Sequence, residues 1–169
     1  MAQSFASIQE ALNQQGFVFG SQITGIPLTG NGAASYQAIN VKGSPVSIFS
    51  LAIGTTANTI TYRLYEDLDY TDETPAKVLN RNRNKQNTNK AQFDVFQNVT
   101  VTPDPAKVIS QSTIDTSRQE SINKIIGFET GIILKINTKY VLEIVKGGSG
   151  SSLTDLTVIF GCTGNTPTN

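Results

Sequence analysis

Long stretches of the chain alternate between apolar and polar residues with a period of two, which is the pattern of β-strands that bury one face. The alternation is clearest at residues 59–66, where Ile60, Tyr62 and Leu64 share one face. Segments of this kind are separated by Gly, Pro, Asn and Ser, which favour turns. We expect further strands at residues 35–41, 46–53, 91–101, 132–136, 139–146 and 153–160.

The segment 46–53 differs from the others because it carries apolar residues on both faces. Val46 and Ile48 lie on one face and Phe49, Leu51 and Ile53 on the other. Such a pattern indicates a strand that is buried on both sides or lies at an interface.

Segments 139–146 and 153–160 are joined by six Gly and Ser residues, 147–152. This joint has the composition of an interdomain linker, but its flanks are two strands, which favours the mobile tip of a hairpin. We therefore expect these two strands to pair with each other.

The first residues predict a short helix. Ser7 and Glu10 have the spacing of a capping box, Phe5, Ile8 and Leu12 form an apolar stripe, and Gly16 suits a helix end. A helix of about two or three turns is unstable alone in water, so it must dock on its own domain or on a neighbour. Residues 20–34 carry four Gly and one Pro, which suits a tether. The expected division is therefore a helix with a Gly-rich arm at 1–34 and a β-sandwich domain at 35–169.

The abundance of Thr, Ser and Asn supports the same fold, because these residues favour strand faces and turns over helix interiors. The sequence therefore predicts an all-β fold: a β-sandwich or jelly roll of about eight strands with a short N-terminal helix or arm.

Composition excludes several classes of function. The chain has no His, no Trp and one Cys, which excludes Ser-His-Asp and Cys-His catalysis and most zinc sites. Thirteen basic and thirteen acidic residues give zero net charge, which argues against a surface built to hold nucleic acid. We expect no enzyme activity and no cofactor, although a carboxylate-pair glycosidase stays open.

The start of the chain lacks the pattern of a secretory signal, and no apolar run approaches the ~18 residues of a membrane span. No membrane association is expected, and the compartment is the cytosol or a particle assembled there.

Two neighbouring segments have opposite charge. Residues 66–73 hold five carboxylates, which suit either a solvated loop or Ca²⁺, without the spacing of an EF-hand loop. Residues 80–90 hold Arg81, Arg83, Lys85 and Lys90 among asparagines, without an aromatic residue to stack on bases. This second segment suits a subunit contact or side-chain hydrogen bonds that lock loops, with a nucleic-acid loop or a solvated loop as alternatives. Cys162 has no His to activate it and is expected to be a buried thiol.

The order of motifs resembles the head decoration proteins of tailed bacteriophages, also called cement or auxiliary capsid proteins. The similarity lies in an N-x-N-R type loop, here Asn80, Arg81, Asn82 and Arg83, and in the entry to the last pair of strands, Leu134-Lys-Ile-Asn-Thr-Lys-Tyr140. It covers roughly residues 46–161.

The resemblance implies a β-sandwich that binds the major capsid protein on the outside of the head, commonly as a homotrimer, and braces the shell. On this hypothesis Asn80, Arg81, Asn82 and Arg83 are subunit-contact or loop-locking residues, and Phe5, Ile8 and Leu12 anchor the arm on the capsid or a neighbour. The alternative is a β-sandwich recognition module of a virion, either a fibre tip or a carbohydrate-binding domain, with Ca²⁺ held by 66–73 and with Tyr65 and Tyr70 available to a ligand.

Overall fold

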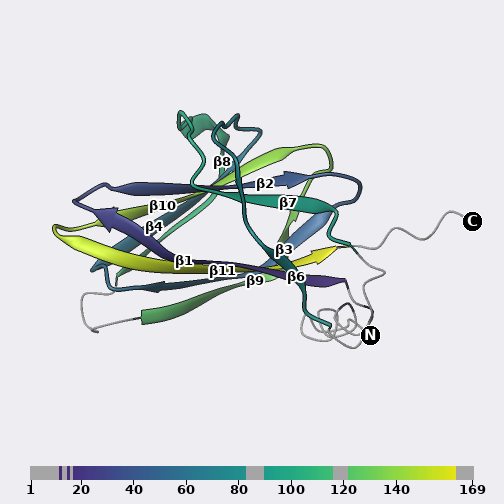
Figure 1. Cartoon of the computed structure of the whole chain (residues 1–169), viewed down its shortest axis with the longest axis horizontal. Coiled ribbons are helices and arrows are strands. Elements are labelled where there is room, and N and C mark those ends of the chain that lie inside the picture. Colours follow the sequence, from purple (N-terminus) through teal and green to yellow (C-terminus); the bar gives the residue numbers. More distant parts are fainter. Residues whose placement is uncertain (1–11, 13–14, 16, 83–89, 116–121, 163–169) are drawn as a thin grey trace, which may run out of the picture.

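The computed structural model describes residues 12, 15, 17–82, 90–115 and 122–162, with the backbone alone for 122–131. Within these ranges eleven strands form two antiparallel sheets that lie face to face (Figure 1). The first sheet has the order β6-β1-β11-β3-β9 and the second has the order β5-β7-β2-β10-β4-β8. The elements are β1 (Val18–Thr29), β2 (Ala34–Val41), β3 (Val46–Thr55), β4 (Thr59–Glu66), β5 (Thr74–Pro75), β6 (Val78–Asn80), β7 (Phe93–Gln97), η1 (Pro105–Lys107), β8 (Val108–Asp115), β9 (Ile122–Leu134), β10 (Lys139–Gly147) and β11 (Ser151–Cys162).

Eight long strands determine the topology. β1, β11, β3 and β9 are neighbours in the first sheet, and β2, β10, β4 and β8 are neighbours in the second. Successive long strands switch sheets except at the step from β4 to β8, which pair with each other. This is the double Greek-key arrangement of a jelly roll, and it confirms the predicted all-β sandwich.

The core lies between the two sheets, and the alternation in the sequence identifies its residues correctly. In β4 the predicted inner face is buried, with Ile60, Tyr62 and Leu64 no more than 4% exposed. At one end of the core the ring of Phe93 packs against Phe19 and Phe160, with centroid distances of 6.0 and 4.4 Å. Such offset aromatic contacts add to the stabilisation from burial.

The two apolar faces predicted for 46–53 have a different explanation, which is a β-bulge. The register shifts on both sides of β3 leave Phe49 without a directly opposite residue on β9 or β11. An extra residue reverses the alternation, so Val46 and Ile48 face the same core as Leu51 and Ile53. Phe49 alone joins a small apolar cluster on the other face.

The predicted tether at 20–34 is wrong for most of its length, because residues 18–29 form β1. This strand pairs with β11 from Val18 to Thr29 and lies inside the first sheet. Its glycines serve the strand and the following turn. Gly25 lies at a register shift with a φ of +68°, and Gly30 and Gly32, with φ of +89° and +78°, make the turn into β2.

The predicted hairpin between the last two strands is also wrong, since β10 and β11 belong to different sheets. The turn at 148–150, with Gly148 and Gly150 at positive φ, carries the chain across the sandwich. The buried Lys146 side chain stabilises this crossing, because its Nζ donates to the carbonyl oxygens of Gly148 (2.7 Å) and Ser149 (3.0 Å). Composition identifies the turn, but it contains no information on which sheet the next strand joins.

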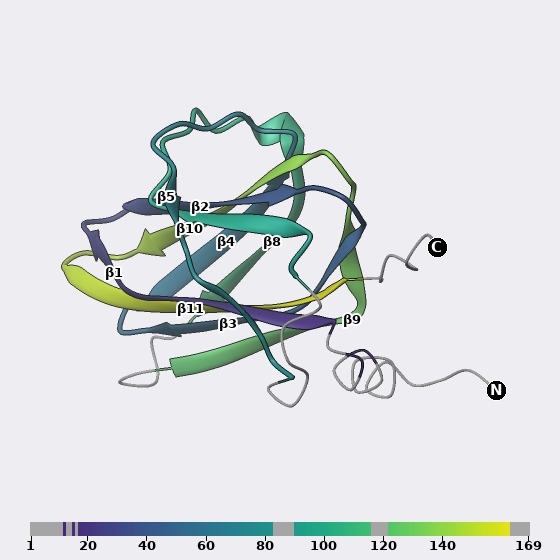
Figure 2. The same cartoon turned by 45° about the vertical axis from the view of Figure 1, so that its right-hand side comes forward.

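The predicted strand at 91–101 is shorter, as β7 ends before Asn98, whose φ is +55°. The connection between β4 and β8 contributes three further strands. β5 pairs with β7 in the second sheet and β6 pairs with β1 in the first, so this connection crosses one edge of the sandwich (Figure 2).

Most of the helix predicted near the start of the chain falls outside the described residues. Nothing among the described helical residues is long and apolar enough to cross a membrane.

Candidate interaction surface

Residues of the Asn-rich motif and of the predicted N-terminal arm lie near each other at one end of the outer face of the first sheet. The backbone N–H of Arg81 donates to the carbonyl oxygen of Val18 at 2.9 Å. The side chain of Leu12 packs against the cluster formed by Val18, Phe49 and Ile159. The structure therefore joins two segments that are separated by about seventy positions in the sequence.

The Asn-rich loop is fixed at its first residues. Asn80 is the last residue of β6 and pairs with Phe19. Its side-chain Oδ1 accepts the backbone N–H of Asn82 at 2.9 Å, which closes an Asx turn. Arg83 lies outside the described residues. The hydrogen bond of Asn80 is one that a loop-locking residue would make.

Of the three predicted anchoring residues of the arm, the structure describes Leu12, whereas Phe5 and Ile8 lie outside the described residues. Leu12 is partly buried on its own sheet, next to Val18 and Ile159, which are 1% and 8% exposed. The carbonyl oxygen of Leu12 accepts the N–H of Phe17, and Phe17 in turn accepts the N–H of Cys162 at 2.9 Å. These contacts hold the entry to β1 against the end of β11.

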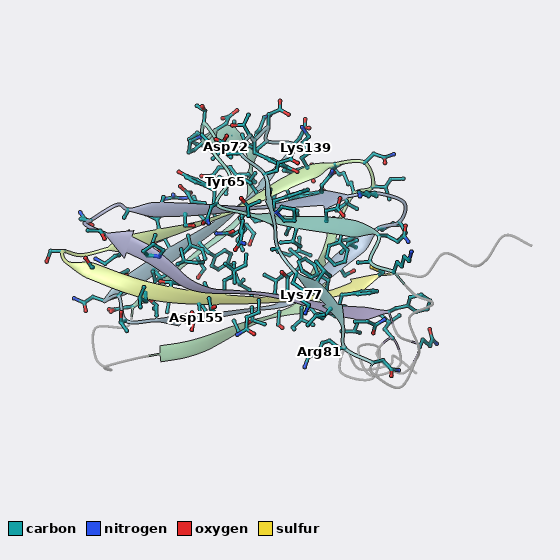
Figure 3. All side chains as sticks on the ribbon, in the orientation of Figure 1. Tyr65, Asp72, Lys77, Arg81, Lys139 and Asp155 are labelled. Atoms are coloured by element: carbon teal, nitrogen blue, oxygen red, sulfur yellow. The ribbon has the colours of Figure 1, made fainter. Side chains whose placement is uncertain are left out.

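A groove of about 530 Å³ runs along this part of the face. Its apolar side chains are Ile159 and Leu79, and its basic side chains are Lys77 and Arg81. Lys77 and Arg81 both lie at the β6 side of the molecule (Figure 3). The groove thus combines an apolar surface with exposed positive charge.

Exposed apolar side chains continue across the same face. Leu79, Leu153 and Ile133 are 46%, 60% and 67% exposed. The residues next to the last two, Thr154 and Leu134, point inward and are buried. Between the exposed side chains the outward positions of β3 and β11 include the small residues Ala52, Gly54 and Thr157 and the exposed carboxylate of Asp155. Several exposed apolar side chains on one face are typical of a surface that contacts another protein.

The acidic run lies far from this groove, beyond the second sheet, as the labelled Asp72 and Arg81 show (Figure 3). Glu66 pairs with Lys135 at 2.6 Å and Asp69 pairs with Lys139 at 3.1 Å. The hydrogen bond from Lys135, supported by one from Tyr140, lowers the pKa of Glu66 despite its partial burial. Within the described ranges, no group of three or more acidic or Cys side chains is arranged to hold a metal ion.

Three residues that were candidates for chemistry or binding are buried. Cys162 is 2% exposed, and burial raises the pKa of its thiol. Tyr65 and Tyr70 are 2% and 7% exposed and pack in a small second core, so neither ring is open to a ligand.

A buried charged cluster that the sequence pattern does not reveal lies on the outer face of the second sheet. Glu143 is 4% exposed and accepts hydrogen bonds from Arg63 at 2.8 Å, Tyr65 at 2.7 Å and Tyr36 at 3.1 Å. Burial and the hydrogen bond to Glu143 raise the pKa of Tyr65 to about 12. The hydrogen bond to Glu143 also raises the pKa of Arg63. A single carboxylate at an outward strand position was the available signal, and its partners depend on strand register.

Comparison with known proteins does not assign a family, as no family model and no curated protein sequence matches the chain. Among solved structures it is similar to the Yersinia pseudotuberculosis-derived mitogen, with a TM-score of 0.34 and 11% identity over 82% of this chain and 83% of that one. The Tobacco streak virus coat protein has a TM-score of 0.31 and 12% identity over 88% and 90%. The Broad Bean Stain Virus structure has a TM-score of 0.26 and 8% identity over 89% and 91%. Similarities this low leave the function to be argued from the chain's own surface.

Proposed function

We propose that this chain is a structural protein of a virus particle, without enzyme activity: a decoration protein on the outside of a tailed-bacteriophage head. Its partner is the shell of the major capsid protein, which it braces by adding contacts between neighbouring shell subunits. The observation that carries the proposal is the groove at β6. It is lined by Asn80 and Arg81, from the motif that resembles that of decoration proteins, and by Ile159, whose cluster Leu12 of the predicted arm packs against.

The chemistry of the groove suits a protein partner. Leu79 supplies apolar area that becomes buried on contact, and Arg81 supplies a planar guanidinium that binds carboxylates in a fixed geometry. Interface cores are enriched in apolar residues and Arg, which matches this composition. The acidic run does not weaken an acidic partner's binding, because it lies beyond the other sheet (Figure 3).

The surrounding face can extend the contact. Leu153 and Ile133 lie on the same side as Leu79, and the small residues Ala52 and Gly54 lie between them. A standard interface buries about 800 Å² on each partner. A trimer would present three such faces, and linked copies bind far more tightly than one because later contacts are effectively intramolecular.

Co-sedimentation with empty heads of tailed phages tests the proposal. The purified protein, added to assembled heads, should pellet with them, which also tests attachment to the capsid exterior. Leu79→Asp and Arg81→Glu should each weaken attachment at least roughly tenfold, since each removes a contact worth on the order of 1.4 kcal/mol. Light scattering of the free protein tests the trimer, which a monomeric mass at micromolar concentration would contradict.

Ile136→Asp is the matched control for Leu79→Asp. Ile136 is 48% exposed, against 46% for Leu79, but it lies in the turn between β9 and β10, away from the groove. The control should pellet like the unaltered protein. The proposal fails if the unaltered protein stays in the supernatant, or if both aspartate variants lose attachment equally.

A further inference from the structure

A row of polar side chains crosses the outer face of the second sheet. Strand register places Tyr36 of β2, Glu143 of β10, Arg63 of β4 and Gln111 of β8 directly beside one another. Their neighbours along the strands, such as Leu142 and Ile144, point into the core. Four strands therefore contribute one polar residue each to a single line.

Arg63 is held in place within this row. Its Nη1 donates to Glu143 Oε2 at 2.8 Å, and the same oxygen accepts the hydroxyl of Tyr65 at 2.7 Å. The Arg63 side chain is 35% exposed, whereas that of Glu143 is 5% exposed. A guanidinium has five N–H donors, so the exposed part of this side chain can offer donors to a ligand beyond the one that binds Glu143.

The Arg63 end of the row opens into a groove of about 710 Å³. This volume is within the range of small-molecule sites. Gln111 of β8 adds a polar side chain beside Arg63, and Pro103, Pro105 and Ile109 form an apolar wall. This groove lies on the opposite side of the sandwich from Lys77 and Arg81, because the two sets of residues belong to the outer faces of different sheets.

We propose that this groove binds a neutral saccharide, with Arg63 and Gln111 contacting its hydroxyl groups and the prolines contacting a sugar ring. Hydroxyls both donate and accept, as does the side chain of Gln111, and a pre-positioned guanidinium is a strong donor to them. The charges of Arg63 and Glu143 cancel, so an anionic ligand gains no net attraction, and its carboxylate would face that of Glu143. This site does not rest on the proposed attachment to phage heads.

Titration of the ¹⁵N-labelled full chain tests the site by NMR. Neutral hexasaccharides of glucose, galactose and mannose are the probes, and a galacturonic acid hexasaccharide is the acidic comparison. We expect at least one neutral probe to shift the Arg63 Nε–H and Gln111 side-chain signals, with a Kd on the order of 1 mM. Gln111→Ala should weaken binding about threefold to tenfold.

A second pair of variants separates recognition from folding. Arg63→Lys keeps a cation beside Glu143 but loses the planar fork, so binding should weaken about tenfold while the strands stay paired. Lys90→Gln removes an exposed positive charge elsewhere on the chain and should bind like the unaltered protein. The proposal is overturned if no neutral probe binds, if the acidic probe alone binds, or if Gln111→Ala and Arg63→Lys both leave Kd unchanged.

Discussion

The ring of Phe49 lies directly against the backbone of Gly161 on the outer face of the first sheet. A Cβ added at Gly161 would meet the Cε2 and Cζ atoms of Phe49 at 2.3 Å, closer than packed carbon atoms can lie. The two residues are on adjacent strands, β3 and β11, next to the bulge that turns Phe49 outward. Because the bulge turns the Phe49 ring toward Gly161, only glycine fits at position 161, although the sequence alone shows nothing more there than the end of a strand.

We expect Gly161→Ala to lower the free energy of unfolding by about 1–3 kcal/mol, because the added methyl group forces the ring or the strand to move. Urea unfolding followed by circular dichroism measures the change. Adding Phe49→Leu should recover part of the loss.

Gly43→Ala is the matched control for this substitution. A Cβ there would lie 2.7 Å from Gln92 Oε1, but that atom is the end of a flexible, half-exposed side chain that can turn away. The control should be nearly neutral. Equal losses for both variants would show that the Phe49 contact is unimportant.

Glu143→Gln should lower stability by about 2–3 kcal/mol, because it leaves the Arg63 cation without its anion and the two tyrosine hydroxyls with a weaker acceptor. The comparison is Asp69→Asn, which removes the ion pair between Asp69 and Lys139. The Asp69 side chain is 95% exposed. Exposed pairs contribute little, so this variant should melt like the unaltered protein. A Glu143→Gln variant of unchanged stability would mean that the cluster is not formed in solution.

The protein should lose stability in alkali as pH rises from about 10 to about 12. Burial is the main cause that raises the pKa of Tyr65, Tyr70 and Tyr140 to about 12, from the ordinary value of 10.0. Below pH 10 the three tyrosines are neutral in the folded and the unfolded protein, and their contribution to stability is complete. Above pH 10 they ionise first in the unfolded chain, which lowers the free energy of unfolding. Each raised pKa corresponds to at most about 2–3 kcal/mol of stability, which is largely lost by pH 12 and fully lost only above it.

Urea midpoints across this pH range and tyrosinate absorbance test the alkaline effect together. Three of the five tyrosines should titrate well above 10 in the folded protein. Tyr65→Phe should reduce the loss of unfolding free energy between pH 10 and pH 12 by about one third. Titration of all five tyrosines near pH 10 would refute the assignment.

Cys162 should react with an aromatic disulfide reagent at least about a hundredfold more slowly in the folded protein than in urea. The reason is that its thiol is buried and its pKa is raised, so little thiolate is present or accessible. Fast labelling of the native protein at neutral pH would contradict the burial and show that the end of β11 opens.

The strand pattern was predictable wherever one face is buried and no residue interrupts the alternation. At 59–66 the predicted strand has the bounds of β4, and its inner face is the one that Ile60 and Leu64 indicate. The prediction was wrong for 20–34 because glycines have no side chain to alternate, so a strand with a bulge and a tether look alike. It was wrong for the faces of 46–53 because one extra residue, Phe49, reverses the alternation that follows it.

The local contacts of the candidate sites could also be predicted from the sequence, whereas the contacts between distant segments could not. The Asn-rich motif was visible in the sequence, and the Asx turn of Asn80 is a local contact that residue type and spacing favour. The grouping of Arg81 with Leu12 around Val18 was not visible, nor was the row from Tyr36 to Gln111, because both depend on which strands become neighbours.

By itself the sequence determined the fold class, the core face of the regular strands and the absence of histidine chemistry, because these follow from residue types and from a period of two. The tertiary structure decided how the strands are distributed between the sheets, including the separation of β10 from β11 that the Gly-Ser turn allows. It also decided where the charges lie: the acidic run and the basic groove, adjacent in sequence, end up on opposite sides of the sandwich (Figure 3). The physical reason is that turns constrain the local direction of the chain, whereas the burial of apolar faces from distant segments selects which strands become neighbours.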